Sequence, residues 1–133
     1  MKGLAANVTK GLNHGSVIIA CDNSGARKMR IISVRGAKTR KDRKPRAGVG
    51  DYVMVSVVEG KTDMRKQVVA AVIVRQRKEY RRHDGTRIQF EDNAAAVIKD
   101  ELGNPKGTVI KGPIAKEAAI RYPMLAKIAR LVI

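Results

Sequence analysis

The two histidines are the first candidates for chemistry, because an imidazole beside a carboxylate can move a proton or bind a metal. His83 lies next to Asp84 in the segment "RRHDGT", whereas His14 stands alone in "GLNHGS". A histidine in a turn among arginines is more often solvated, or in contact with a phosphate, than catalytic. We therefore expect no catalytic role for either histidine.

Two Asp-Asn pairs are the other candidates, because their carboxylates could bind a metal if the fold brought them together. The pairs are Asp22-Asn23 in "CDNSGA" and Asp92-Asn93 in "FEDNAA". Asp and Asn beside serine and glycine are typical of turns, where their side chains bond to nearby backbone N–H groups. The segments "GVGDYV" and "GNPKGT" also lack the spacing of phosphate-binding loops. We expect no metal, no cofactor and no enzymatic activity.

The single cysteine, Cys21 in "SVIIACD", can form neither an internal disulfide nor a cysteine-based zinc site. Its apolar neighbours predict a small buried residue rather than a reactive thiol. The length of 133 residues suits a single domain over 1–133 that buries its own core without such cross-links.

Charge is the strongest signal in the composition. Lysine and arginine number 28 against 12 acids, which gives a net charge of +16. Such an excess indicates a polyanionic partner. No apolar run is long enough for a membrane span, and the first residues lack the apolar stretch of a secretory signal, so we expect a cytoplasmic protein with no membrane partner. Nucleic acid is therefore favoured over a lipid surface.

Aromatic residues are too few and too scattered for a platform on which bases stack: they are Tyr52, Tyr80, Phe90 and Tyr122. Binding should then depend on phosphate contacts and on the shape of a folded RNA or a duplex. The clusters of basic residues supply the candidate binding side chains, which are Arg27, Lys28, Lys38, Arg40, Lys41, Arg43, Lys44, Arg46, Arg75, Arg77, Lys78, Arg81 and Arg82.

The elements that must position these side chains are short β-branched segments separated by Gly, Asn, Asp and Pro, a pattern that predicts a strand-rich chain and a small closed barrel. The apolar run Val68 to Val74 indicates a strand covered on both faces. A basic hairpin over 75–90 should leave the barrel as an arm, with Arg87 on its return strand and a type I′ turn at Asp84-Gly85.

Three further segments complete the predicted organisation: an N-terminal extension over 1–15, a basic loop over 36–47 and short helices over 113–130. Pro113 and Pro123 each suit the first turn of a helix, and Tyr122 should lie outside the α region because a proline follows it. An apolar stripe at helical spacing should pack on the core; it consists of Leu125, Ile128, Ala129 and Val132.

Six segments together resemble the universal large-subunit ribosomal protein 14 family in their order and spacing. They are "DNSGA" at 22–26, "AGVGD" at 47–51, "VVAAVIVRQRK" at 68–78, "DGT" at 84–86, "DNAAAVI" at 92–98 and "GTVIKGPIAKE" at 107–117. The first fifteen residues and the long basic loop resemble the archaeal and eukaryotic branch more than the bacterial one, and the chain's ending is most similar to archaeal members.

The resemblance implies a five-stranded β-barrel with a protruding β-ribbon and short C-terminal helices. It implies binding to large-subunit rRNA at the intersubunit face, no catalytic activity, contacts with neighbouring large-subunit proteins and a bridge to small-subunit rRNA. It also implies docking of initiation factor six, an anti-association factor. On this basis the intersubunit or factor-facing residues are expected to be Gly112, Pro113, Ala115 and Lys116.

Two other functions remain open from the residues alone. A free DNA-binding chromatin protein with a basic barrel would have the same composition and would be found with DNA rather than with the large subunit. An enzyme acting on nucleic acid would need Asp22, His83 or Asp92 for its chemistry.

Overall fold

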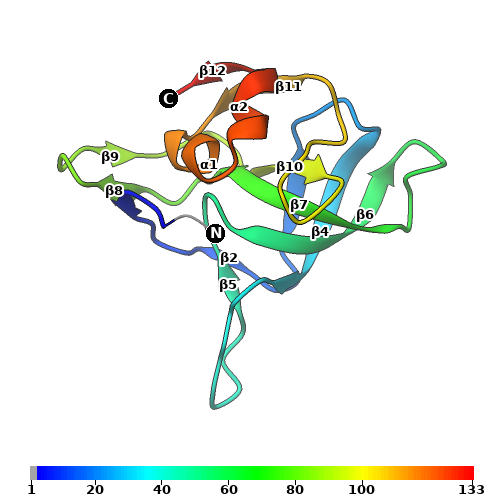
Figure 1. Cartoon of the computed structure of the whole chain (residues 1–133). Helices are drawn as coiled ribbons and strands as arrows, with labels where there is room; N and C mark the ends of the chain where they lie inside the picture. Colours follow the sequence, from blue (N-terminus) through cyan, green and yellow to red (C-terminus); the bar gives the residue numbers. More distant parts are fainter. Residues whose placement is uncertain (1–2) are drawn as a thin grey trace.

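A five-stranded closed barrel forms the centre of the molecule (Figure 1). The computed structural model describes residues 3–133. The strands follow the order β10-β3-β4-β6-β7, and every neighbouring pair is antiparallel except β10 and β3. Their bounds are Val17–Ala20 (β3), Ala26–Val34 (β4), Tyr52–Gly60 (β6), Val68–Arg75 (β7) and Ala94–Ile98 (β10). The predicted barrel is confirmed.

Two apolar cores lie on opposite sides of the barrel wall. Alternate residues of a strand point to opposite faces, so in β7 Ala71 and Ile73 pack inside the barrel, whereas Val72 and Val74 pack outside it. The outer core is closed by β11 (Ile110–Ile114) and two short helices, α1 (Lys116–Arg121) and α2 (Pro123–Ile128). This double burial explains why the sequence of β7 is a continuous apolar run, as predicted.

The C-terminal region departs from the predicted helices over 113–130. Pro113 lies in strand β11, which pairs in parallel with β12 (Ala129–Val132). The prediction of a helical start at Pro113 was therefore wrong, and the helical stripe ends at Ile128 because the next residues form a strand. Pro123 does begin α2, and Tyr122 before it has φ −128° and ψ 82°, outside the α region as predicted.

The predicted arm is a hairpin of β8 (Tyr80–Arg82) and β9 (Arg87–Ile88), with β1 (Ala6–Asn7) of the N-terminal extension added to the free edge of β8. Its turn is not type I′, because that turn needs positive φ at both central residues and only Gly85 has it, with φ 87°. The N–H of Gly85 donates to the carbonyl of Arg82, and the N–H of Arg82 donates to that of Thr86. This pattern fits a three-residue loop with a glycine bulge.

A second small ribbon forms the base of the basic loop, where β2 (Leu12–Asn13) pairs with β5 (Arg46–Ala47). The chain then turns into β6 through Gly48 and Gly50. Gly50 has φ 85°, a backbone conformation that favours glycine. At Gly48 the reason for glycine is lack of space, because a Cβ there would lie 2.7 Å from Val8 Cγ1. Among residues 3–133, no helix is long and apolar enough to cross a membrane.

Candidate nucleic-acid interface

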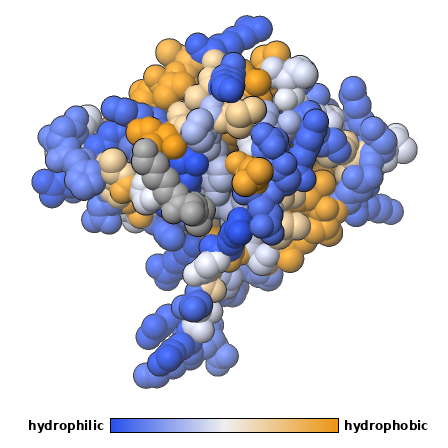
Figure 2. Space-filling view, in the orientation of Figure 1, coloured by the Kyte–Doolittle hydropathy of each residue, from blue (hydrophilic) through white to orange (hydrophobic). Residues whose placement is uncertain are grey.

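The basic loop over 36–47 projects from the barrel as a separate finger (Figure 1, bottom). Its six cations are all exposed, and none forms a salt bridge with any residue from 3 to 133; they are Lys38, Arg40, Lys41, Arg43, Lys44 and Arg46. Lys41 and Asp42 turn the tip with φ 56° and 58°. In Figure 2 this finger is almost wholly hydrophilic. Crowded cations without internal partners fit an external polyanion.

The base of the loop is held by buried polar contacts rather than by its charges. Asp51 Oδ2 accepts from the N–H of Gly48 at 2.8 Å, and Gln76 Oε1 accepts from the N–H of Val49 at 2.8 Å. The amide of Gln76 also donates to the carbonyls of Thr9 and Lys78, at 2.9 and 2.7 Å. Gln76 thus connects the loop base, the N-terminal extension and the start of the arm. Sequence reasoning missed it, because a glutamine between two arginines has no apolar pattern that predicts its burial.

The arm presents its own exposed cations, namely Arg77, Lys78, Arg81 and Arg87. Arg87 lies 3.4 Å from the exposed carboxylate of Glu79. Exposed pairs of this kind are weak and screened by salt, so Arg87 stays available to a phosphate. The arm extends to the side of the barrel away from the β6–β7 turn (Figure 1).

Arg75, by contrast, is used inside the protein. Its Nε and Nη2 donate to both carboxylate oxygens of Asp92, at 2.8 and 3.0 Å, and its Nη1 donates to the carbonyls of Lys111 and Pro113. The side chain is only 10% exposed. Arg75 therefore fixes β11 against the barrel and has little surface left for a nucleic acid.

Arg82 is held in a similar way at the base of the arm. Its Nε donates to Glu117 Oε1 at 2.7 Å, and the hydroxyl of Tyr80 donates to Glu117 Oε2 at 2.7 Å. Arg82 also donates to the carbonyl of Ile133. Burial, followed by the hydrogen bond to Glu117, raises the pKa of Tyr80. The glutamate was not singled out by the sequence, yet it joins the arm, α1 and the C-terminus.

The remaining predicted binding residues lie on the outer face of the barrel. Arg27 and Lys28 are both exposed on β4. Lys28 Nζ lies 3.5 Å from Glu59 on the neighbouring strand, where both side chains are about half exposed. Both residues can therefore still meet a phosphate.

The first Asp-Asn pair proves to be structural, as predicted. Asp22 accepts from the Ser24 hydroxyl at 2.7 Å and from the N–H of Val97 at 2.9 Å. Asn23 accepts from the N–H of Thr108 at 2.7 Å. These contacts anchor the turn to β10 and to the segment before β11, a long-range role that the turn pattern did not predict.

In the second pair, Asp92 binds Arg75 and the Oδ1 of Asn93 accepts from the N–H of Arg77 at 2.8 Å. Within residues 3–133, no group of three or more His, Cys, Asp or Glu side chains could hold a metal ion.

Cys21 is buried, and its Sγ donates to the carbonyl of Ala95 at 3.4 Å.

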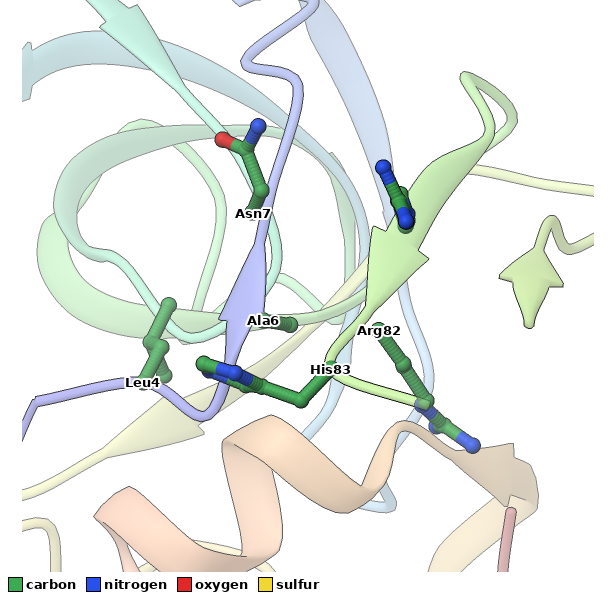
Figure 3. A pocket seen from close by; sticks show the side chains of 6 residues that line it. Leu4, Ala6, Asn7, Arg82 and His83 are labelled. Atoms are coloured by element: carbon green, nitrogen blue, oxygen red, sulfur yellow. The ribbon is translucent and has the colours of Figure 1, made fainter. Parts of the chain in front are cut away.

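His83 lies in the exposed arm turn, beside a hollow between β1 and β8 (Figure 3). Leu4, Ala6 and Asn7 line the other side of this hollow. The other polar side chains of this hollow are those of Asn7, Arg81 and Arg82, whereas Asp84 and Glu117 line a second hollow on the other side of His83. His14 is also exposed, at the end of β2.

The segment expected to face the small subunit divides into exposed and buried positions. Gly112 and Lys116 are exposed and Pro113 is half-buried. Ala115, however, is 0% exposed within this chain, so its side chain packs in the outer core and cannot meet a partner as predicted. Gly112 has φ 78°, and a Cβ there would lie 2.7 Å from Arg75 Nη1.

Fold and surface together define a basic β-barrel protein that displays exposed cations on a finger and an arm. The family model described as ribosomal protein L14p/L23e matches residues 11–133, and the chain belongs to this family. It is 53% identical over 133 residues to the protein named large ribosomal subunit protein uL14 of Nanoarchaeum equitans, with both chains covered in full. The proteins of the same name from Haloarcula marismortui, at 51% over 133 residues and again all of both chains, and from Methanococcus maripaludis, at 48% over 132 residues and 99% of each, are similar to it as well.

The chain is accordingly a structural constituent of the large ribosomal subunit in the cytoplasm, and not an enzyme. This confirms the resemblance to archaeal members of the family. Membership of this family also means that the prediction of a ribosomal protein is confirmed and the alternative of a free chromatin protein is wrong.

Proposed function

We propose that the chain binds large-subunit rRNA through the basic loop and the arm. The observation that carries the proposal is the set of six exposed loop cations that form no salt bridge with residues 3–133. Lysine and arginine at such positions neutralise phosphates where RNA helices approach one another and release counterions. Arg77, Lys78, Arg81, Arg27 and Lys28 extend this surface, whereas Arg75 and Arg82 act mainly as internal supports.

The salt dependence of binding to purified rRNA tests this proposal. If about six phosphates are contacted, log affinity should fall with log salt concentration with a slope of about −5. Changing Arg40, Lys41, Arg43 and Lys44 together to alanine should reduce the size of that slope by about three to four, because each lost phosphate contact removes nearly one counterion.

The matched control exchanges lysine and arginine at the same four positions, which keeps every charge. Its slope should equal that of the unchanged protein. An unchanged slope in the alanine variant would exclude the loop from the rRNA interface.

We further propose that Gly112, Pro113 and Lys116 form part of the surface that faces the small subunit and initiation factor six, with a bridge to small-subunit rRNA. The support is that this short segment is held firmly from behind by Arg75 while the side chain of Lys116 is exposed. A rigid support with an exposed cation suits a contact that forms and breaks repeatedly. Lys116→Glu should weaken binding of the purified factor, whereas Lys44→Glu, at an exposed position on the finger that projects away from α1 (Figure 1), should not.

A further inference from the structure

A hollow beside the β6–β7 turn (residues 61–67) is lined by three cations from three separate elements. Arg27 comes from the start of β4, Lys61 from the turn and Lys111 from β11. The hollow has a volume of about 430 Å³. All three residues are exposed, and none forms a salt bridge with any residue from 3 to 133. We call this feature the three-cation hollow.

Two glycines among the lining residues leave backbone accessible in the hollow. Gly25 and Gly60 are both half-buried there, and they lie against each other. A Cβ on Gly60 would be 2.6 Å from the carbonyl oxygen of Gly25, and a Cβ on Gly25 would be 3.2 Å from Met64 Cγ. Side chains at these two positions would therefore be crowded, whereas glycine allows a ligand to approach the backbone closely.

Two of the cations start from backbone that is held by hydrogen bonds. The N–H of Lys61 donates to the carbonyl of Gly25 at 2.9 Å, and the N–H of Lys111 donates to the carbonyl of Cys21 at 2.6 Å. The carbonyl of Lys111 accepts from Arg75 Nη1 at 2.8 Å. The two side chains can therefore reach a ligand from a main chain that is already ordered, which lowers the entropy lost on binding.

The third cation, Arg27, is placed by a β-bulge. Ala26 pairs with Gly60 and Lys28 pairs with Glu59, so Arg27 has no partner on β6. A bulge re-aims side chains of the strand that carries the extra residue. This explains why Arg27 and Lys28 are both exposed although successive residues of a regular strand point to opposite faces.

The acids near the hollow do not neutralise its cations. Asp22 is the single acid that lines it among residues 3–133, and it is 5% exposed because its carboxylate is bonded within the protein. Glu59 lies near Lys28, which does not line the hollow. Elsewhere on the β6–β7 turn one exposed acid is outnumbered by exposed cations; these residues are Asp63, Arg65 and Lys66. The hollow therefore suits an anion.

We propose that the three-cation hollow binds a phosphate group of the rRNA backbone. A guanidinium and two ammonium groups can donate to the several acceptor oxygens of one phosphate. The inference rests on the proposed binding of rRNA, but it uses a different part of the surface, because Lys61 and Lys111 lie on neither the finger nor the arm.

The position of the hollow implies that the barrel holds the RNA at two separate points. β4 begins beside the hollow and ends next to the finger, and a strand of this length spans about 25 Å. In Figure 1 β6 ends on the right, whereas the finger projects at the bottom. A phosphate in the hollow is therefore not one of those that the finger contacts.

The salt dependence of binding to purified rRNA, in a buffer without phosphate, tests the hollow. Changing Arg27, Lys61 and Lys111 together to alanine should reduce the size of the slope by about one, because one phosphate contact is lost. The matched control exchanges lysine and arginine at the same three positions and should keep the slope. An unchanged slope in the alanine variant would overturn the proposal. So would a reduction of about three, because the cations would then contact separate phosphates.

Combining this variant with the alanine variant of the finger separates the two proposals. The two reductions in slope should add, because distant sites act independently. If only the hollow variant changed the slope, the finger would be excluded from the rRNA interface and the hollow would stand. If only the finger variant changed it, the hollow alone would be excluded.

Photocrosslinking in assembled large subunits identifies the ligand. The crosslinking amino acid replaces Thr62, beside the hollow, or Thr39 on the finger, which are both exposed threonines, so every cation is kept. From position 62 we expect crosslinks to rRNA, at nucleotides that position 39 does not reach. Crosslinks from position 62 to protein alone, or to the same nucleotides as from position 39, would overturn the proposal.

Discussion

At the scale of single residues, charge alone does not decide which cations serve binding. Arg75 and Arg77 are two positions apart in a basic stretch, yet Arg75 is buried against Asp92 whereas Arg77 is exposed. The difference comes from the position of a carboxylate that is 17 residues away in the chain. A buried arginine must be paired, because an unpaired charge in the interior is costly.

Glu117 should be among the most sensitive residues in the chain. Glu117→Ala leaves the Arg82 guanidinium and the Tyr80 hydroxyl without their shared acceptor, and we expect a loss of about 3 kcal/mol in the free energy of unfolding. Urea denaturation measures this loss. Glu79→Ala removes the exposed partner of Arg87 and should cost less than about 1 kcal/mol. Equal losses in the two variants would contradict a structural role for the Glu117 network.

Cys21 should make the protein less stable at alkaline pH. Burial raises the pKa of its thiol from 9.0 to about 12. A folded pKa above the unfolded one means that the folded state retains a proton which the unfolded state has lost, so stability falls as pH rises from about 9 toward 12. By pH 10.5 this loss should reach about 2 kcal/mol, from about 1.4 kcal/mol per pH unit.

The measurement compares urea denaturation of the protein and of Cys21→Ala, under reducing conditions, between pH 8 and 10.5. The alanine variant is less stable at pH 8 because it loses packing, but the gap between the two proteins should narrow with pH. If the free energies of unfolding of the two proteins changed in parallel with pH, the thiol would have the same pKa in the folded and unfolded states, which would contradict the prediction.

At the scale of elements, the finger and the arm are built differently from the barrel that holds them. The barrel strands pack on two apolar cores, whereas the finger depends on its base, where β2 pairs with β5 and buried polar groups close the turn into β6. The exposed cations lie toward the tip of the finger, whereas the hydrogen bonds that fix its conformation lie at the base. A change at the base should therefore alter the finger without unfolding the barrel.

Gln76→Leu provides that change. It removes the acceptor of the Val49 N–H and the donors to Thr9 and Lys78. Hydrogen exchange of the Val49 amide should become about tenfold faster or more, because a buried hydrogen bond is lost. Gln67→Leu is the control. The side-chain amide of Gln67 donates to the carbonyl of Asp63 in an exposed turn, so its loss should not alter exchange at Val49. Unchanged exchange in Gln76→Leu would show that the base holds without this side chain.

At the scale of the whole molecule, the proposed contacts lie on different parts of the surface. The exposed cations of the finger and the arm are the proposed rRNA contacts, and Gly112, Pro113 and Lys116 are the residues proposed to face the small subunit. On the wall of the barrel, by contrast, the exposed side chain of Val68 lies near both carboxylates and lysines, namely Asp100, Glu101, Lys99 and Lys106. A net charge of +16 therefore does not mean a uniformly RNA-facing surface.

The strand-rich fold, a polyanionic partner and the family could all be predicted from the amino-acid sequence. Local patterns carry that information: β-branched segments between turn residues, 28 basic residues, and six motifs in a fixed order. The sequence also indicated the two-sided burial of β7, because a strand between two cores must be apolar on both faces.

The roles of individual polar residues, by contrast, could be assigned only from contacts in the folded chain. The fold placed Arg75 and Arg82 in internal pairs, buried Ala115 and Gln76, moved Pro113 from a helix into a strand, and showed a glycine bulge where type I′ was expected. The physical reason is that pairing and burial depend on contacts between distant segments. Glu117 bonds to Arg82, which is 35 residues away in the sequence, and no local pattern of residues predicts a contact over that separation.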